Sequence, residues 1–153
     1  MRIREAVAAD ATALTALYTE LVGDPAIRVL PTQLGTLATH PDHAVLVVEQ
    51  DDGLVATAHL LFCMDAMYAD QPYALVENVV VAERTRGQGI GAALFREIDR
   101  RCLARNCSKI MLLSNAARSD AHRFFEQAGY GGDRKRGFVK YRRDIESDTA
   151  KIA

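Results

Sequence analysis

Residues 79–92 read VVVAERTRGQGIGA, and they decide how the rest of the chain is interpreted. The unbroken apolar run Val79-Val80-Val81 is typical of a strand that is covered on both faces. Gly87, Gly89 and Gly91 follow at alternate positions, where glycine permits turn geometry and the close approach of a ligand. The helix that should begin there presents unbonded amide groups and the positive end of its dipole. The order strand, glycine loop, helix therefore predicts a site for a phosphate group.

The residues that follow the loop argue against two other phosphate-binding motifs. A P-loop needs Lys and then Ser or Thr after its last glycine, whereas Gly91 is followed by Ala92-Ala93. Residues 87–92 formally fit the dinucleotide fingerprint G-x-G-x-x-A, which needs a carboxylate after the next strand. The chain has Leu113-Ser114-Asn115 there. A connecting turn that binds nothing is the alternative that stays open.

The composition is that of one soluble domain. A chain of 153 residues, 49% of them hydrophobic and 25% charged, is long enough to bury one core and has no membrane-spanning run. The net charge of −1 offers no field that would recruit nucleic acid or an anionic membrane. Residues 1–5 lack the apolar stretch of a secretory signal, so we expect a cytoplasmic protein. Cys63, Cys102 and Cys107 fit neither a disulfide framework nor a zinc site, and we expect free thiols and no metal.

Periodicity and turn residues predict the other elements. Strands are expected at 3–7, 44–48, 54–62, 73–81, 109–113 and 137–142, and helices at 11–22, 32–38, 90–106 and 120–128. Asp10 should cap the first helix, and Asp51-Asp52-Gly53 should turn a hairpin. This order describes one mixed α/β domain over residues 1–143, followed by a polar, frayed tail at 144–153.

The segment Arg86-Gly87-Gln88-Gly89-Ile90-Gly91 resembles the R/Q-x-x-G-x-G/A signature of the GCN5-related N-acetyltransferases (GNAT). Residues 77–81 are similar to the central strand of that family, 106–113 to its next strand, and 121–130 to its A-x-x-F-Y-E-x-x-G-F block. The resemblance implies a single mixed β-sheet, flanked by helices, in which two central parallel strands splay apart. It also implies that acetyl-CoA enters the split and that an amine attacks it directly, without a covalent enzyme intermediate.

The loop and the resemblance together assign residues to the coenzyme. They are Val79, Val80, Val81, Arg86, Gly87, Gln88, Gly89, Ile90, Gly91, Ala92, Asn115 and Phe125. The backbone N–H near Val79 would receive the thioester carbonyl, where a preorganised donor contributes about 3 kcal/mol to the transition state.

Glu77 is the expected catalytic base, because it lies just before the apolar run Val79–Val81 and the resemblance implies that it corresponds to a strand glutamate that many members of the family use, often through water. An aliphatic amine has a pKa near 10.4, so at pH 7 it cannot attack a thioester until a base removes its proton. Simple alternation would place Glu77, Val79 and Val81 on one face of the strand, and Asn78 and Val80 on the other. The alternative is that Glu77 only pairs with a neighbouring basic residue.

The chain departs from the family at two positions. Phe125 stands where the family has the tyrosine that protonates the leaving thiolate; Tyr130 and Ser119 are the nearby replacements, and Tyr130 is our catalytic candidate. Reprotonation by water or by the ammonium proton stays open. Arg118 stands at the usual asparagine of this block, and Asn115 is the candidate to replace that contact.

The remaining polar residues point to no other chemistry. Ser119, Asp120 and His122 are explained by a helix start rather than a hydrolase triad, since no nucleophile elbow G-x-S-x-G occurs. His40, His43 and His59 have no evident convergent partners in the sequence.

The acceptor is expected to be a small-molecule or peptide amine. Residues 24–39 and 63–72 should shape its site, and an apolar-aromatic pocket could be lined by Met64, Met67, Tyr68 and Tyr73. The rival hypothesis is a non-catalytic acyl-CoA-binding module of the same fold, and a homodimer is left open.

Overall fold

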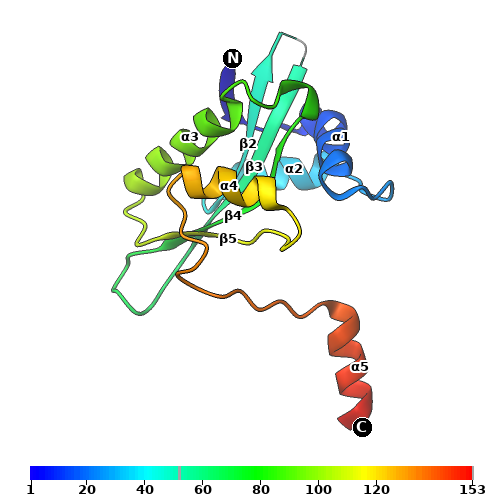
Figure 1. The fold of residues 1–153 in the computed structure, drawn as a ribbon, viewed down its shortest axis with the longest axis vertical. Helices are drawn as coiled ribbons and strands as arrows, with labels where there is room; N and C mark the ends of the chain where they lie inside the picture. The colour runs from blue at the N-terminus through cyan, green and yellow to red at the C-terminus, as the bar shows by residue number, and fades with distance from the viewer. Residues whose placement is uncertain (52, 153) are drawn as a thin grey trace. The chain divides into compact units, whose positions relative to one another are not determined.

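A five-stranded sheet in the order β1-β2-β3-β4-β5 organises residues 1–113 in the computed structural model (Figure 1). The structure describes residues 1–51 and 53–152, with side chains up to residue 147, and residues 1–113 and 114–153 form two compact units. The strands are β1 Arg2–Glu5, β2 His43–Gln50, β3 Gly53–Cys63, β4 Tyr73–Val81 and β5 Ile110–Leu112. The first four are antiparallel neighbours, whereas β5 runs parallel to β4. The expected mixed sheet is confirmed.

Helices cover both faces of this sheet. The first unit contains η1 Ala8–Asp10, α1 Ala11–Val22, α2 Pro31–Thr39, η2 Glu83–Thr85 and α3 Ile90–Ala104. Figure 1 shows α1 and α2 on one side of the strands and α3 on the other. The second unit contains α4 Ser119–Gln127 and α5 Arg142–Ile152. The four helices expected from the sequence are confirmed to within two residues at each end.

Alternation along β2 divides the core between the two faces. Val47 packs with Leu14 of α1 and Leu34 of α2 in one buried cluster. The preceding residue, Leu46, points to the opposite face, where α3 lies and where Leu94 is fully buried. Each such side chain contributes about 1.5–3 kcal/mol when it leaves water. The β2–β3 hairpin is formed as expected, although Asp52 of its turn lies outside the described residues.

Asp10 is the N-cap residue of α1, as expected, although its side chain does not act as the cap. Its carboxylate makes no bond to the helix amides and instead accepts the backbone N–H of Val7 at 2.8 Å and the Arg4 guanidinium at 2.7 Å. The hydrogen bond from Arg4, more than the bond from Val7, lowers the pKa of Asp10 despite partial burial. Asp10 thus closes the 3-10 turn η1 and ties it to β1, because a basic residue lies within reach on the neighbouring strand.

The strand expected at 137–142 is also absent from the structure. Residues 137–141 have no regular structure, and α5 begins at Arg142, so the tail is helical rather than frayed. A strand needs a partner for its backbone groups, and none of the described strands pairs with this segment. Local contacts favour a helix instead: Asp144 accepts the Tyr141 N–H at 3.2 Å, and Arg142 pairs with Glu146 one turn later at 2.7 Å.

Candidate active site

The parallel strands β4 and β5 separate halfway along β4. Their pairing covers only Ala74↔Ile110, Leu75↔Met111 and Val76↔Leu112. From Glu77 to Val81, β4 continues beside β3, and no described strand pairs with its other edge. The splayed parallel strands expected from the sequence are therefore confirmed. Backbone N–H and C=O groups at such an edge can bind an extended ligand as a further strand would.

A β-bulge lies in β4 just beyond the point of separation. Asn78 has a φ of +54°, and the register with β3 shifts there, so that Ala58 faces both Asn78 and Val79. Glu77 is paired with His59, and Val80 with Thr57. An extra residue of this kind leaves the ladder, bends the strand and is over-represented beside active sites.

The bulge corrects the expected assignment of side chains to faces. Because His59 and Thr57 are two residues apart on β3, they share a face, and so do their partners Glu77 and Val80. Val81 is opposite Ala56 and lies on the other face. Simple alternation, which grouped Glu77 with Val81, fails because one inserted residue reverses it. Val80 is 3% exposed in the cluster formed with α1 and α2, so Glu77 belongs to the α1/α2 side of the sheet.

The glycine loop follows β4 through the short helix η2. Gly87 and Gly89 have φ values of +78° and +76°, and Gly89 is the N-cap of α3. A Cβ built at either position would meet nothing within 4 Å, so the protein itself demands glycine only for the backbone conformation. The open space beside both residues leaves room for a ligand. The predicted order of strand, glycine loop and helix is confirmed.

Arg86 is held by contacts that the sequence did not predict. Its Nη2 lies 3.3 Å from Oε1 of Glu20, and its Nε donates to the carbonyl oxygen of Val81 at 3.2 Å. The same Glu20 oxygen accepts the backbone N–H of Glu83 at 2.7 Å. The end of α1 is therefore tied directly to the start of the glycine loop, across more than 60 residues of sequence.

Three histidines converge near Glu77, although we had expected no partners for them. His43 Nδ1 and His59 Nε2 share a hydrogen bond of 3.0 Å, and His40 meets the edge of His43 at a ring distance of 4.6 Å. Burial, with a smaller contribution from His43, lowers the pKa of His59 to about 4. His59 is thus neutral near pH 7. The contact between His43 and His59 could have been predicted from the hairpin at Asp51-Asp52-Gly53, because that hairpin brings positions 43 and 59 onto neighbouring strands.

The other predicted site residues, Asn115, Phe125 and Tyr130, belong to the second unit. Asn115 Oδ1 accepts the Ala117 N–H at 2.9 Å, and the Asn115 carbonyl contacts His122 Nε2 at 2.9 Å. The rings of Phe125 and Tyr130 meet edge to face with 6.5 Å between their centroids. These contacts order the unit internally, and the roles of the three residues toward a ligand stay predictions.

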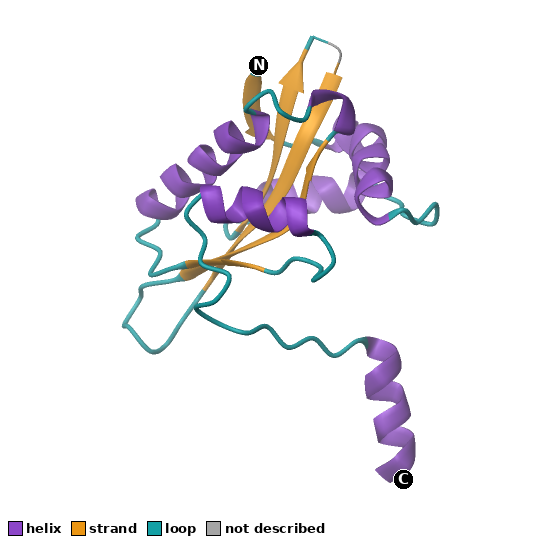
Figure 2. Cartoon of the chain, in the orientation of Figure 1, coloured by secondary structure: helices purple, strands orange, loops and turns teal. Residues whose placement is uncertain are grey.

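The loop from 64 to 72 is open to solvent. It is the teal connection between β3 and β4 in Figure 2. Met64, Met67 and Tyr68 are exposed, and their part in binding an acceptor stays a prediction. Cys63 beside it, like Cys102 and Cys107, is a free thiol, and burial, more than the neighbouring Cys107, raises the pKa of Cys102 to about 12.

Within the described residues, no group of His, Cys, Asp and Glu side chains could hold a metal ion. No helix in that part of the chain is long and apolar enough to cross a membrane.

Comparison with known proteins gives a consistent result. Residues 7–130 match the model of the Acetyltransferase (GNAT) family. A solved structure named "Putative acetyltransferase from Agrobacterium tumefaciens str. C58" is 28% identical and has a TM-score of 0.83, covering 92% of this chain and 100% of its own. Two further solved structures share the fold. Glucosamine-6-phosphate N-acetyltransferase from Arabidopsis thaliana is 19% identical with a TM-score of 0.77, over 92% of this chain and 97% of its own. Ribosomal-protein-alanine N-acetyltransferase from Brucella melitensis biovar Abortus 2308 is 18% identical with a TM-score of 0.73, over 92% of this chain and 98% of its own. No curated protein matches the sequence.

Proposed function

Because this chain belongs to the Acetyltransferase (GNAT) family, we propose that it transfers the acetyl group of acetyl-CoA to a primary amine of a small molecule or a peptide. Two of the structural neighbours reported above differ in their acceptors: one is named for an amino-sugar phosphate and the other for an alanine of a protein. The fold is therefore compatible with either class of acceptor.

The observation that carries the proposal is the continuity of residues 77–91. The open edge of β4, the bulge at Asn78 and the glycine loop follow one another along this segment. An extended thioester can pair with the edge of the strand while its pyrophosphate reaches the amides at the start of α3. A chain that only joined β4 to α3 would need the loop but not the bulge or the open edge.

Each predicted residue has a defined part in this reaction. Glu77 removes the proton from the ammonium form of the acceptor, directly or through a water molecule. The backbone N–H of Val79 donates to the thioester carbonyl oxygen as negative charge develops there. Tyr130 or water returns a proton to the leaving sulfur, so an acceptor that begins as ammonium releases one proton per turnover. Arg86 and the amides of residues 87–92 hold the pyrophosphate, and Asn115 and Phe125 contact the rest of the coenzyme.

The proposal is tested by two measurements on the full chain. Acetyl-CoA at a hundredfold excess over its dissociation constant should stabilise the fold by about 2.7 kcal/mol, seen as a higher melting temperature. Thiol release should then identify an acceptor in a panel of small amines and peptides with free N-termini or lysines. A melting temperature that responds to NADH and not to millimolar CoA would exclude the proposal. Binding of acetyl-CoA without thiol release for any amine would favour the rival binding module.

A further inference from the structure

Glu20 occupies an unusual position for a surface carboxylate. It lies in the last turn and a half of α1, and a single oxygen, Oε1, accepts both the Glu83 N–H at 2.7 Å and the Arg86 guanidinium at 3.3 Å. An exposed ion pair alone contributes only about 0–1 kcal/mol. The bond to a backbone N–H is different, because it fixes the path of the main chain rather than one flexible side chain.

The Glu83 N–H is the first amide of η2, and the cap residue of that short helix, Ala82, offers no side-chain acceptor. Glu20 therefore caps η2 from a distant helix. A charge-assisted bond of this length is among the stronger hydrogen bonds in proteins. Because η2 ends at Thr85, one residue before Arg86, its orientation sets where the glycine loop begins.

The same contact selects one orientation for Arg86. Nε is occupied by the Val81 carbonyl and Nη2 by Glu20, so the plane of the guanidinium is set by two bonds. Guanidinium has five N–H donors, and among the described contacts Nη1 makes none with the protein. A phosphate oxygen can thus bind Nη1 while Glu20 stays in place.

We propose that Glu20 is a positioning residue for coenzyme binding, which it supports by capping η2 and orienting Arg86. This inference rests on the proposed function of the glycine loop. We expect this positioning to depend on an oxygen acceptor at this point rather than on its negative charge. A carboxylate charge beside a pyrophosphate is, by itself, unfavourable.

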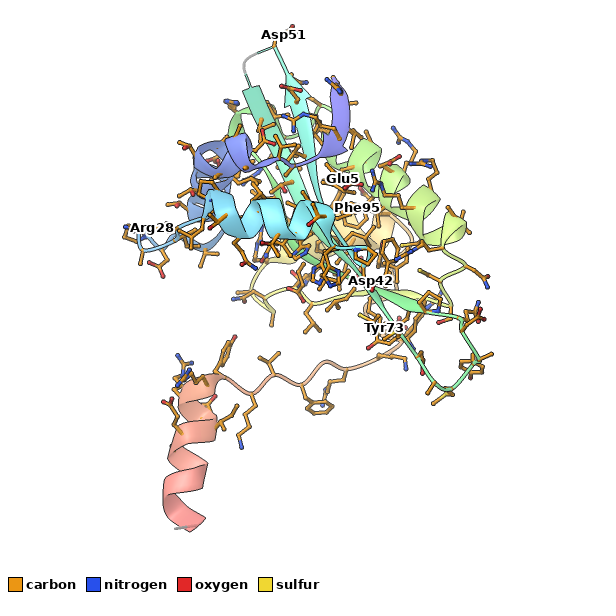
Figure 3. The ribbon with its side chains drawn as sticks, turned by 180° about the vertical axis from the view of Figure 1, so that it is seen from behind. Glu5, Arg28, Asp42, Asp51, Tyr73 and Phe95 are labelled. Carbon is orange, nitrogen blue, oxygen red and sulfur yellow. The ribbon has the colours of Figure 1, made fainter. Side chains whose placement is uncertain are left out.

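The experiment compares Glu20→Gln with Glu20→Ala. Glutamine keeps an oxygen that can accept both bonds, so its dissociation constant for CoA should stay within about threefold of the parent value. Alanine removes both bonds, and CoA should bind about tenfold more weakly by calorimetry. Amide hydrogen exchange at Glu83, measured by NMR without ligand, should accelerate in Glu20→Ala only. Asp51→Asn, at the tip of the β2–β3 hairpin (Figure 3), makes the same change of charge at a residue that is not a partner of Glu20 in either bond, and it should alter neither quantity.

A double-mutant cycle with Arg86→Gln completes the test. If Glu20 acts through Arg86, the combined loss in Glu20→Ala/Arg86→Gln should be smaller than the product of the two single losses. If Glu20→Ala binds CoA as tightly as the parent chain and its Glu83 exchange is unchanged, the inference about Glu20 is overturned, whereas the proposed function is not. Failure of the parent chain to bind CoA would overturn the proposed function as well, so the two failures are distinguishable.

Discussion

Residues 77–98 and residues 114–147 are held in different ways. The first segment is fixed by distant partners: β4 pairs with β3, α3 buries residues from Ile90 to Cys102, and Glu20 reaches the loop from α1. In the second segment, α4 contains no buried residue, and its polar contacts join near neighbours such as Asp120 with Arg123. Single substitutions in the first segment should therefore have large, specific effects on binding and catalysis, and a conservative substitution in the second, such as one at Phe125, should have a small effect.

The largest effect is expected at Glu77. Glu77→Gln keeps the size of the side chain but cannot accept a proton, so the rate at pH 7 should fall by about 10²–10⁴-fold while CoA affinity stays nearly unchanged. Raising the pH toward about 10 supplies free amine and should restore part of the activity. Steady-state rates on an identified acceptor, with Glu49→Gln at the far end of β2 as control, provide the measurement. Full activity of Glu77→Gln at pH 7 would mean that the proton leaves by another route.

The next effect concerns the loop. Gly89→Asp places a side chain at φ +76° and a negative charge where a pyrophosphate must approach, so it should abolish the stabilisation of about 2.7 kcal/mol by CoA. Gly53→Asp is the matched control, because Gly53 also has a positive φ, +106°, but is the first residue of β3 and not part of the glycine loop. The control should lower the melting temperature and still respond to CoA. Normal CoA binding by a folded Gly89→Asp protein would show that the loop is not the phosphate site.

A smaller effect concerns acid stability. His59 has a pKa of about 4 in the folded chain against its ordinary 6.5, so between these values the unfolded chain takes up a proton that the native chain refuses. The contribution of neutral His59 to the free energy of unfolding is complete above pH 6.5 and is lost as the pH falls toward 4.

Urea unfolding at several pH values in this range measures how steeply the free energy of unfolding falls with pH. His59→Gln should make this pH dependence shallower. His122→Gln, in the second unit, should retain it. An unchanged pH dependence in His59→Gln would mean that other groups account for the acid sensitivity in this range.

The smallest effect is expected at Phe125, in the second segment. Phe125→Tyr adds a hydroxyl that can donate a proton, and CoA affinity should change by less than about twofold. The rate should rise by less than about tenfold, because water can also protonate a thiolate whose conjugate acid has a pKa near 8.5. Calorimetry and thiol release measure the two quantities. A large loss of CoA binding would contradict the contrast drawn between the two segments.

Local signals explain what could be predicted from the sequence. The helix at 11–22, the hairpin and the strand–loop–helix order around Gly89 depend on turn residues and periodicity within a short window, and the structure contains all of them. The glycines of the loop were identified in the same way, whereas Glu77 was identified from its place before the apolar run and from the family resemblance; the roles of all these residues stay predictions.

The missed features depend on register or on distant partners. The bulge at Asn78 is one extra residue relative to β3, and no property of the sequence 77–81 alone reveals it. The contact of Glu20 with Arg86 joins positions 66 residues apart. The residues at 137–142 are ones that strands favour. β-propensity, however, reflects packing against a neighbouring strand, and no described strand lies beside this segment in the sheet.

The left-handed conformation of Asn78 also limits how this position can vary. At a φ of +54°, glycine, asparagine and aspartate are tolerated, whereas a β-branched residue is strongly strained. The neighbouring positions 79–81 are all valine, the residue that strands favour. Position 78 therefore has the residue preferences of a turn, although it lies within a strand. Random mutagenesis of β4 should recover only glycine, asparagine and aspartate at position 78, and mainly β-branched residues at positions 79–81.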